Sequence, residues 1–113
     1  MAKGTTFKMN KEVQEKVLQF GRQLEQDGIP INKLVIFGSY AKNNATKDSD
    51  IDVCVVSPIF GRDSIDELNL LSNESRKIDT RIEAYPASPA YYEQLESPLI
   101  WEIRKYGLEV YSI

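Results

Sequence analysis

The sequence predicts an α+β domain built on a mixed β-sheet of about four strands, with helices packed on one side of the sheet. Short apolar runs typical of buried strands occur along the chain together with segments of helical periodicity. Their order is helix, strand, strand, helix, strand, helix, helix, strand. With 113 residues and 42% apolar side chains, the chain has the length of one domain and can form a core without a disulfide or a structural metal.

The first predicted element is an amphipathic helix that follows a loose tail. Residues 1–7 are rich in small side chains, so we expect a flexible tail there and a single domain over 8–113. Asn10 can cap the helix, and Asp27-Gly28 can end it. Apolar residues recur between these positions at intervals of three and four, which is the helical signature. The predicted buried face consists of Val13, Val17, Phe20, Gly21 and Leu24.

Two short runs are expected to form central strands. Residues 33–37 and 51–56 are continuous, apolar and rich in β-branched side chains. Between them, residues 40–48 are polar and contain Asn43-Asn44, which indicates a loop with at most one helical turn. Ser57-Pro58 closes the second strand.

The rest of the chain is expected to add one strand, three helices and a final strand. Residues 78–85 alternate apolar and polar side chains as a half-buried strand does, and each of two later helices begins with Ser-Pro, a cap followed by a first-turn proline. In chain order the predicted elements are a helix over 63–76, a strand over 78–85 that Pro86 ends, helices over 89–96 and 98–105, Gly107 as a helix end, and a strand over 108–111.

The composition excludes several classes of chemistry. Because the chain has no His, it can form neither a Ser-His-Asp triad nor a His-ligated zinc site. Its one cysteine, Cys54, lies in an apolar run, which predicts a buried thiol and a reducing compartment. The sequence shows no signal core and no apolar run long enough to cross a membrane, so we expect a cytoplasmic protein. A net charge of -3 argues against non-specific binding to duplex nucleic acid.

Two carboxylates at the start of the second predicted strand are the main chemical signal. Gly38-Ser39 ends the first strand, ten residues follow, and Asp50-x-Asp52 opens the second. Because alternate side chains of a strand share a face, Asp50 and Asp52 project together while Ile51 points into the core. Two hard oxygen ligands without a nearby His suit Mg²⁺. One or two such ions can clamp the oxygens of a phosphoryl displacement.

A third carboxylate would complete such a site, and the third predicted strand offers two candidates. Glu83 is preferred because Ile82 and Ala84 flank it, and a carboxylate between buried neighbours is fixed in direction. Asp79 is the alternative. Arg81 lies on the same face as Asp79, however, so these two residues can also form an ordinary surface ion pair.

Gly38-Ser39 is a candidate phosphate-binding turn. A glycine leaves room for backbone amides to approach a phosphate, and a serine hydroxyl can donate to a phosphate oxygen. Each motif is unspecific alone, since Gly-Ser after a strand usually marks only a turn and the chain has 17 acids. The combination of strand, Gly-Ser, fixed interval, Asp-x-Asp and later acid is specific.

The segment 38–56 resembles the signature of the nucleotidyltransferase superfamily with the DNA polymerase β-like palm. The short chain resembles the minimal nucleotidyltransferase (MNT) branch of that superfamily. Ile82-Glu83-Ala84 stands where the family places its third carboxylate, and residues 97–111 resemble its closing helix and strand. The resemblance therefore covers most of the chain.

The resemblance implies transfer of a nucleoside monophosphate from a nucleoside triphosphate, expected to be ATP, to an acceptor hydroxyl. Asp50, Asp52 and Glu83 would be the catalytic residues and the ligands of one or two Mg²⁺ ions, with Glu83 also the base. Gly38 and Ser39 would hold the triphosphate. Lys42 would assist them, although many relatives have Arg at this position and Lys lacks the bidentate fork of Arg.

The resemblance also implies a partner, because larger relatives bind the acceptor with an additional domain. The acceptor would be recognised by a partner or by a second copy of the chain. Minimal nucleotidyltransferases are often antitoxins paired with a small helical HEPN toxin, and some transfer AMP to it. Tyr91, Tyr92 and Trp101 either complete the edge of the core or anchor such a partner.

Two other functions are consistent with the sequence. One is a non-catalytic, antitoxin-like binding module that neutralises a helical partner. The other is a regulatory domain that binds a nucleotide or another ligand without a metal.

Overall fold

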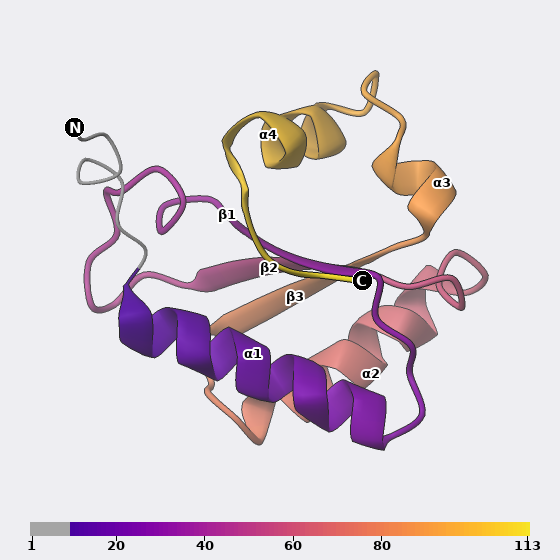
Figure 1. The fold of residues 1–113 in the computed structure, drawn as a ribbon, viewed down its shortest axis with the longest axis horizontal. Helices are drawn as coiled ribbons and strands as arrows, with labels where there is room; N and C mark the ends of the chain where they lie inside the picture. Colours follow the sequence, from indigo (N-terminus) through magenta and orange to yellow (C-terminus); the bar gives the residue numbers. More distant parts are fainter. Residues whose placement is uncertain (1–9) are drawn as a thin grey trace.

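The computed structural model describes residues 10–113, so the predicted tail over residues 1–7 lies outside the described residues. Eight elements follow one another along the chain (Figure 1). They are α1 (Lys11–Gln26), β1 (Lys33–Phe37), β2 (Ile51–Val56), α2 (Ser64–Arg76), β3 (Ile82–Ala87), α3 (Pro89–Tyr92), α4 (Pro98–Tyr106) and β4 (Leu108–Ser112).

The four strands form one mixed sheet in the order β3-β2-β1-β4. β1 is antiparallel to both β2 and β4, whereas β3 is parallel to β2. A parallel pair needs a crossover connection, which α2 provides between β2 and β3. The predicted α+β class and the mixed sheet of four strands are confirmed.

Helices cover both faces of this sheet. Leu34 and Ile36 belong to a core cluster with α1 and α2, while Val35 and Phe37 belong to a second cluster with α3 and α4. Figure 1 shows α1 and α2 below the sheet and α3 and α4 above it. The predicted helical layer is therefore formed by α1 and α2, and two short helices cover part of the opposite face.

The N-terminal elements have the expected boundaries and burial. The side chain of Asn10 accepts a hydrogen bond from the N–H of Val13 (3.2 Å), so it caps α1 as predicted. All five predicted apolar positions of α1 are buried, and β1 and β2 have the predicted bounds. Burial also raises the pKa of the Cys54 thiol to about 12, in agreement with the predicted buried cysteine.

The prediction for the third strand was wrong, because the strand occupies Ile82–Ala87 and not 78–85. The Asp79 carboxylate accepts the N–H of Arg81 (2.9 Å), and the Asp79 carbonyl accepts the N–H of Ile82 (3.1 Å). These bonds fold the preceding residues into a turn, so the apolar alternation there does not reflect a strand. Pro86 lies within β3, which is possible because β3 is an edge strand.

The helix after Ser88 is also shorter than predicted. α3 ends at Tyr92 and not near residue 96, because the chain turns there and Ser97 caps a new helix by accepting the N–H of Ile100 (3.4 Å). Tyr92 is buried, while Trp101 on α4 is 46% exposed. No helix between residues 10 and 113 is long and apolar enough to cross a membrane.

The packing of α4 against the sheet can be tested by Ile103→Ala. Ile103 is 1% exposed and belongs to the second core cluster, so the substitution should lower the free energy of unfolding by about 3 kcal/mol. Leu95→Ala, at a 50% exposed position, should change it by less than about 0.5 kcal/mol. Urea denaturation measures both values. A cost below about 1 kcal/mol for Ile103→Ala would contradict the helical cover on this face.

Candidate active site

The sheet topology brings the predicted site residues to one end of the sheet. β1 ends where its antiparallel neighbour β2 begins, and β3 begins at the same end because it is parallel to β2. In the sheet register Phe37 pairs with Asp52, and Asp52 pairs with Glu83. Gly38, Asp52 and Glu83 therefore come together although they are far apart in the sequence.

The acids lie on the face of the sheet that α3 and α4 partly cover. Asp52 lies on the same face of β2 as Cys54, and Glu83 lies on the same face of β3 as Ala87. Cys54 and Ala87 both belong to the second core cluster. Asp52 is half-buried, whereas Asp50 and Glu83 are exposed. The site is consequently open to solvent at the end of the strands, with its central carboxylate partly enclosed.

The three carboxylates form one electrostatic cluster. Burial, together with the smaller effects of the charges on Glu83 and Asp50, raises the pKa of Asp52 to about 6. Within residues 10–113, no basic side chain lowers the pKa of Asp52, so a bound cation would stabilise the negative charge of this cluster.

The donor set fits a divalent cation in its chemistry. Carboxylate oxygens are the ligands that Mg²⁺ prefers, and Asp50, Asp52 and Glu83 would supply them. Within residues 10–113, however, no three acidic side chains are already gathered as a metal site. Glu83 instead accepts a hydrogen bond from the Tyr85 hydroxyl (3.2 Å). Closing the site around an ion therefore requires at least one carboxylate to rotate.

Gly38 makes the close approach of the turn to the acids possible. Its φ of 74° is in the region that favours glycine, and a Cβ at this position would collide with the Asp52 carboxylate. Beyond it the chain turns sharply, because the Gly38 carbonyl accepts the N–H groups of Ala41 (3.1 Å) and Lys42 (3.0 Å). Ser39, the residue after Gly38 in this turn, is half-buried.

Lys42 is held by α4. Its ammonium forms an ion pair with Glu102 (2.6 Å) and lies 5.0 Å from the ring centroid of Tyr106. The hydrogen bond to Glu102 is the main cause of a raised Lys42 pKa. A role in phosphate binding would require Lys42 to leave this contact.

Asp79, the alternative third acid, is paired with Arg81 as the ion-pair interpretation predicts. The Arg81 guanidinium contacts the Asp79 carboxylate at 2.9 Å and lowers the pKa of Asp79. Arg81 also reaches the hydroxyl of Tyr40 (3.4 Å). This network fastens the turn before β3 to the loop after β1, while Glu83 is the acid that lies beside Asp52.

Sequence reasoning missed two contributors to the site, Tyr85 and Glu102. The Tyr85 hydroxyl donates to Glu83, and burial together with the acid cluster raises the Tyr85 pKa to about 12, so it remains a donor at neutral pH. The signal for Tyr85 was present, because it lies two residues after Glu83 and shares its face. Glu102 gave no such signal, since it is 60 residues from its partner Lys42.

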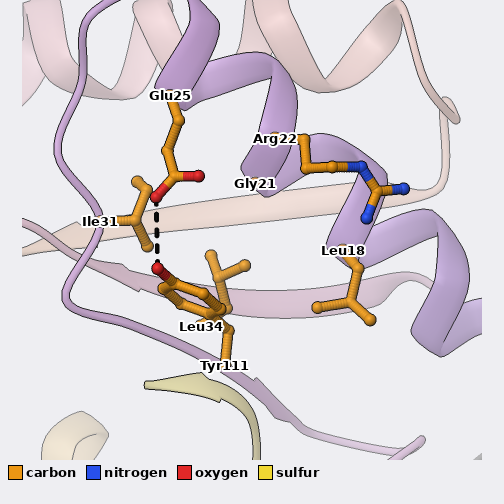
Figure 2. Close-up of a pocket in the computed structure, with 7 residues that line it drawn as sticks. All are labelled: Leu18, Gly21, Arg22, Glu25, Ile31, Leu34 and Tyr111. Atoms are coloured by element: carbon orange, nitrogen blue, oxygen red, sulfur yellow. Dashed lines mark hydrogen bonds between the residues drawn. The ribbon is translucent and has the colours of Figure 1, made fainter. Parts of the chain in front are cut away.

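A separate hollow of about 260 Å³ lies between α1 and the strands β1 and β4 and includes none of the predicted site residues (Figure 2). Its walls are mainly apolar, and the Tyr111 hydroxyl donates to Glu25 across it (3.4 Å). It is lined by Leu18, Gly21, Arg22, Glu25, Ile31, Leu34 and Tyr111.

The sequence profile of the nucleotidyltransferase domain family matches residues 11–107. The chain belongs to this family. A candidate protein adenylyltransferase of Methanocaldococcus jannaschii, MJ1547, is 43% identical over 49 residues, which are 43% of this chain and 37% of that protein. The chain thus matches little more than a third of the length of this curated relative.

Solved structures share the fold at low sequence identity. A candidate nucleotidyltransferase from Sulfolobus solfataricus superimposes with a TM-score of 0.59 at 21% identity, covering 96% of this chain and 89% of that one. A complex of a tri-AMPylated HEPN toxin from Shewanella oneidensis with its MNT antitoxin gives a TM-score of 0.57 at 20% identity, covering 89% of this chain and 73% of that one. These structures show that the chain has the nucleotidyltransferase fold, and the profile match confirms the family that the sequence resembles.

Because ionisation of Asp52 is unfavourable in the folded protein, we predict that Asp52→Asn stabilises the metal-free protein at pH 7.5. The folded-state pKa of about 6 is above the ordinary value of 3.8. The protonated Asp52 carboxyl therefore makes its full contribution to the free energy of unfolding below pH 3.8, and this contribution is lost as the pH rises through about 6. With allowance for solvent screening, we expect a gain of about 1 kcal/mol for the amide at pH 7.5.

Urea denaturation in EDTA at pH values from 4 to 8 measures this effect. The difference between Asp52→Asn and wild type should grow across the interval from 4 to 6 and then stay constant. Asp48→Asn, at an exposed position of the loop before β2, is the matched control and should show no such rise. A pH-independent difference for Asp52→Asn would contradict the raised pKa.

Proposed function

We propose that this chain is a Mg²⁺-dependent nucleotidyltransferase that moves AMP from ATP to an acceptor hydroxyl. The observation that carries the proposal is the meeting of Gly38-Ser39 with Asp50, Asp52 and Glu83 at one end of the sheet, in a chain of the nucleotidyltransferase family. No one of these residues is diagnostic alone, but their joint placement matches what phosphoryl transfer needs, namely positioning and electrostatic stabilisation.

The proposed reaction is an in-line displacement at the α-phosphorus. The acceptor oxygen forms a new P–O bond while the bond to the bridging oxygen of pyrophosphate breaks, and pyrophosphate leaves with that electron pair. The acceptor proton passes to the Glu83 carboxylate, which the Tyr85 hydroxyl orients. One or two Mg²⁺ ions, held by Asp50, Asp52 and Glu83, would supply charge neutralisation of the triphosphate.

The turn after β1 would hold the triphosphate. The absence of a Cβ at Gly38 keeps the backbone against the Asp52 carboxylate, so a phosphate bound at the turn would lie beside the metal ligands. The Ser39 hydroxyl would donate to one of its oxygens. Lys42 would add a positive charge only after exchanging Glu102 for a phosphate oxygen.

The acceptor is proposed to be a small helical partner protein of the HEPN type. This proposal is supported by the shared fold of this chain with an MNT antitoxin that is bound to a tri-AMPylated HEPN toxin. Further support comes from the local similarity to a candidate protein adenylyltransferase. Under this proposal the hydroxyl that receives AMP belongs to a protein side chain.

A second candidate function is a non-catalytic antitoxin-like module that neutralises its partner by binding. Two observations favour it: the ion pair that holds Lys42 on α4, and the absence of three gathered acidic side chains within residues 10–113. Such a module would bind its partner equally well with Asp50 and Asp52 replaced.

Nucleotide binding distinguishes these functions. Calorimetric titration with α,β-methylene-ATP, whose α–β bridge cannot be cleaved, should show binding in Mg²⁺ that EDTA abolishes. The double variant Asp50→Asn/Asp52→Asn should weaken binding in Mg²⁺ at least tenfold, because the ion loses two of its ligands. Asp48→Asn should bind as wild type does. Absence of binding by wild type would favour the binding module, and binding that EDTA leaves unchanged would favour the metal-free regulatory domain.

The ion pair of Lys42 leads to a separate prediction. If Lys42 moves to the triphosphate, Lys42→Ala should raise the Kd of α,β-methylene-ATP about tenfold, because a charge-assisted contact is lost. Glu102→Gln should lower the Kd, because it releases Lys42 from its competing partner. The same calorimetric titration measures both. Unchanged affinity in both variants would show that Lys42 has only the structural role of joining the loop to α4.

A further inference from the structure

A groove runs along the outer edge of β3 and reaches the candidate active site. It consists of two adjoining hollows of about 300 and 330 Å³, which share Leu68 and Tyr85 in their walls. The first hollow includes Glu83 and is bounded by α2, and the second extends past Pro86 to Leu99 on α4. The groove therefore follows the strand from the proposed base toward the far end of the sheet.

The backbone of β3 is open to this groove at Ala84. The carbonyls of Arg81 and Ala87 accept N–H groups from Ile51 (2.8 Å) and Ser57 (3.0 Å), so odd-numbered residues of β3 pair with the β2 side. In a parallel ladder the intervening residues direct their N–H and C=O groups the other way. Ala84, next to Glu83, thus presents a donor and an acceptor to the groove.

The lining of the groove suits a polypeptide better than a polynucleotide. Leu68 and Leu99 are 42% and 38% exposed, and Ala84 and Pro86 add apolar surface between them. Among the described residues that line the groove, Arg76 is the one cation, and it is accompanied by the acids Glu67 and Glu83. A polynucleotide would bring phosphates against these acids, whereas peptide side chains can be buried on the leucines.

We propose that this groove binds an extended segment of the acceptor polypeptide, which pairs with Ala84 and thereby presents its hydroxyl to Glu83. The proposal rests on the proposed nucleotidyl transfer and adds the location and the conformation of its substrate. Addition of a strand to an open sheet edge is a common mode of peptide recognition, in which backbone bonds give affinity and side-chain contacts give specificity.

The geometry also defines the kind of segment that fits. Side chains of an added strand alternate between the two faces of the sheet. The hydroxyl side chain belongs on the face of Glu83 and Tyr85, and its two neighbours then point toward α2, where Leu68 lies. The preferred segment has a hydroxyl residue between apolar residues, with an acidic residue able to reach Arg76.

Peptide labelling tests the proposal. The acceptors are an array of nine-residue peptides with a central tyrosine and varied flanks, incubated with the protein, Mg²⁺ and ATP labelled at the α-phosphate. We expect wild type to label peptides with apolar residues on both sides of the tyrosine. Leu68→Asp should reduce this labelling at least tenfold, because it places a charge on the apolar wall. Leu95→Asp, at a similarly exposed site outside the groove, is the matched control and should label as wild type does.

Ala84→Pro tests the backbone contact separately, because it removes the outward N–H and adds little volume. Pro86 occupies the equivalent outward position two residues later, so β3 can hold a proline there. Labelling should fall at least tenfold while binding of α,β-methylene-ATP and cooperative unfolding are retained.

The outcomes separate the groove from the reaction. Equal peptide labelling by Leu68→Asp, Ala84→Pro and wild type would overturn the groove proposal. So would a wild-type protein that binds ATP with Mg²⁺ and labels RNA or no acceptor in the array. A wild-type protein that neither binds ATP nor releases pyrophosphate would overturn the proposed function, and the groove proposal with it.

Discussion

The site depends on the pairing of β2 with a parallel neighbour on one side and an antiparallel neighbour on the other. Only this arrangement places the end of β1 beside the beginnings of β2 and β3. The register is strongly specified, because a shift by one residue would turn the apolar set of β2 away from the α1 and α2 layer. The same core packing that fixes the strands therefore fixes Asp52 between Gly38 and Glu83.

This pairing produces the electrostatic property of the site. Placing Asp52 and Glu83 at paired positions of neighbouring strands puts like charges close together, which is unfavourable without a cation. A structural role alone would not require this arrangement. The raised pKa of Asp52 and the exposure of Asp50 and Glu83 are instead consistent with the proposed function. In that function the negative charge of the site is balanced only when a cation binds together with the triphosphate.

Sequence reasoning found the parts of the fold that depend on local pattern and missed those that depend on distant contacts. Continuous apolar runs located β1 and β2, and the spacing of apolar residues located the buried face of α1. The start of β3 was misplaced because the turn at Asp79 imitates strand alternation. The ion pair of Lys42 with Glu102 could not be predicted, since it exists only after α4 folds over the sheet.

The open edge of β3 is confined to the region of the site, which argues for a function at that edge. Exposed strand edges invite unwanted pairing, and proteins commonly protect them. The N–H of Ile82 is used by the turn at Asp79, and its carbonyl accepts the Ser75 hydroxyl (3.5 Å). Pro86 has no N–H to offer. Within β3, Ala84 is thus the residue whose outward donor and acceptor are both left for a partner strand, and it adjoins the carboxylate proposed to receive the acceptor proton.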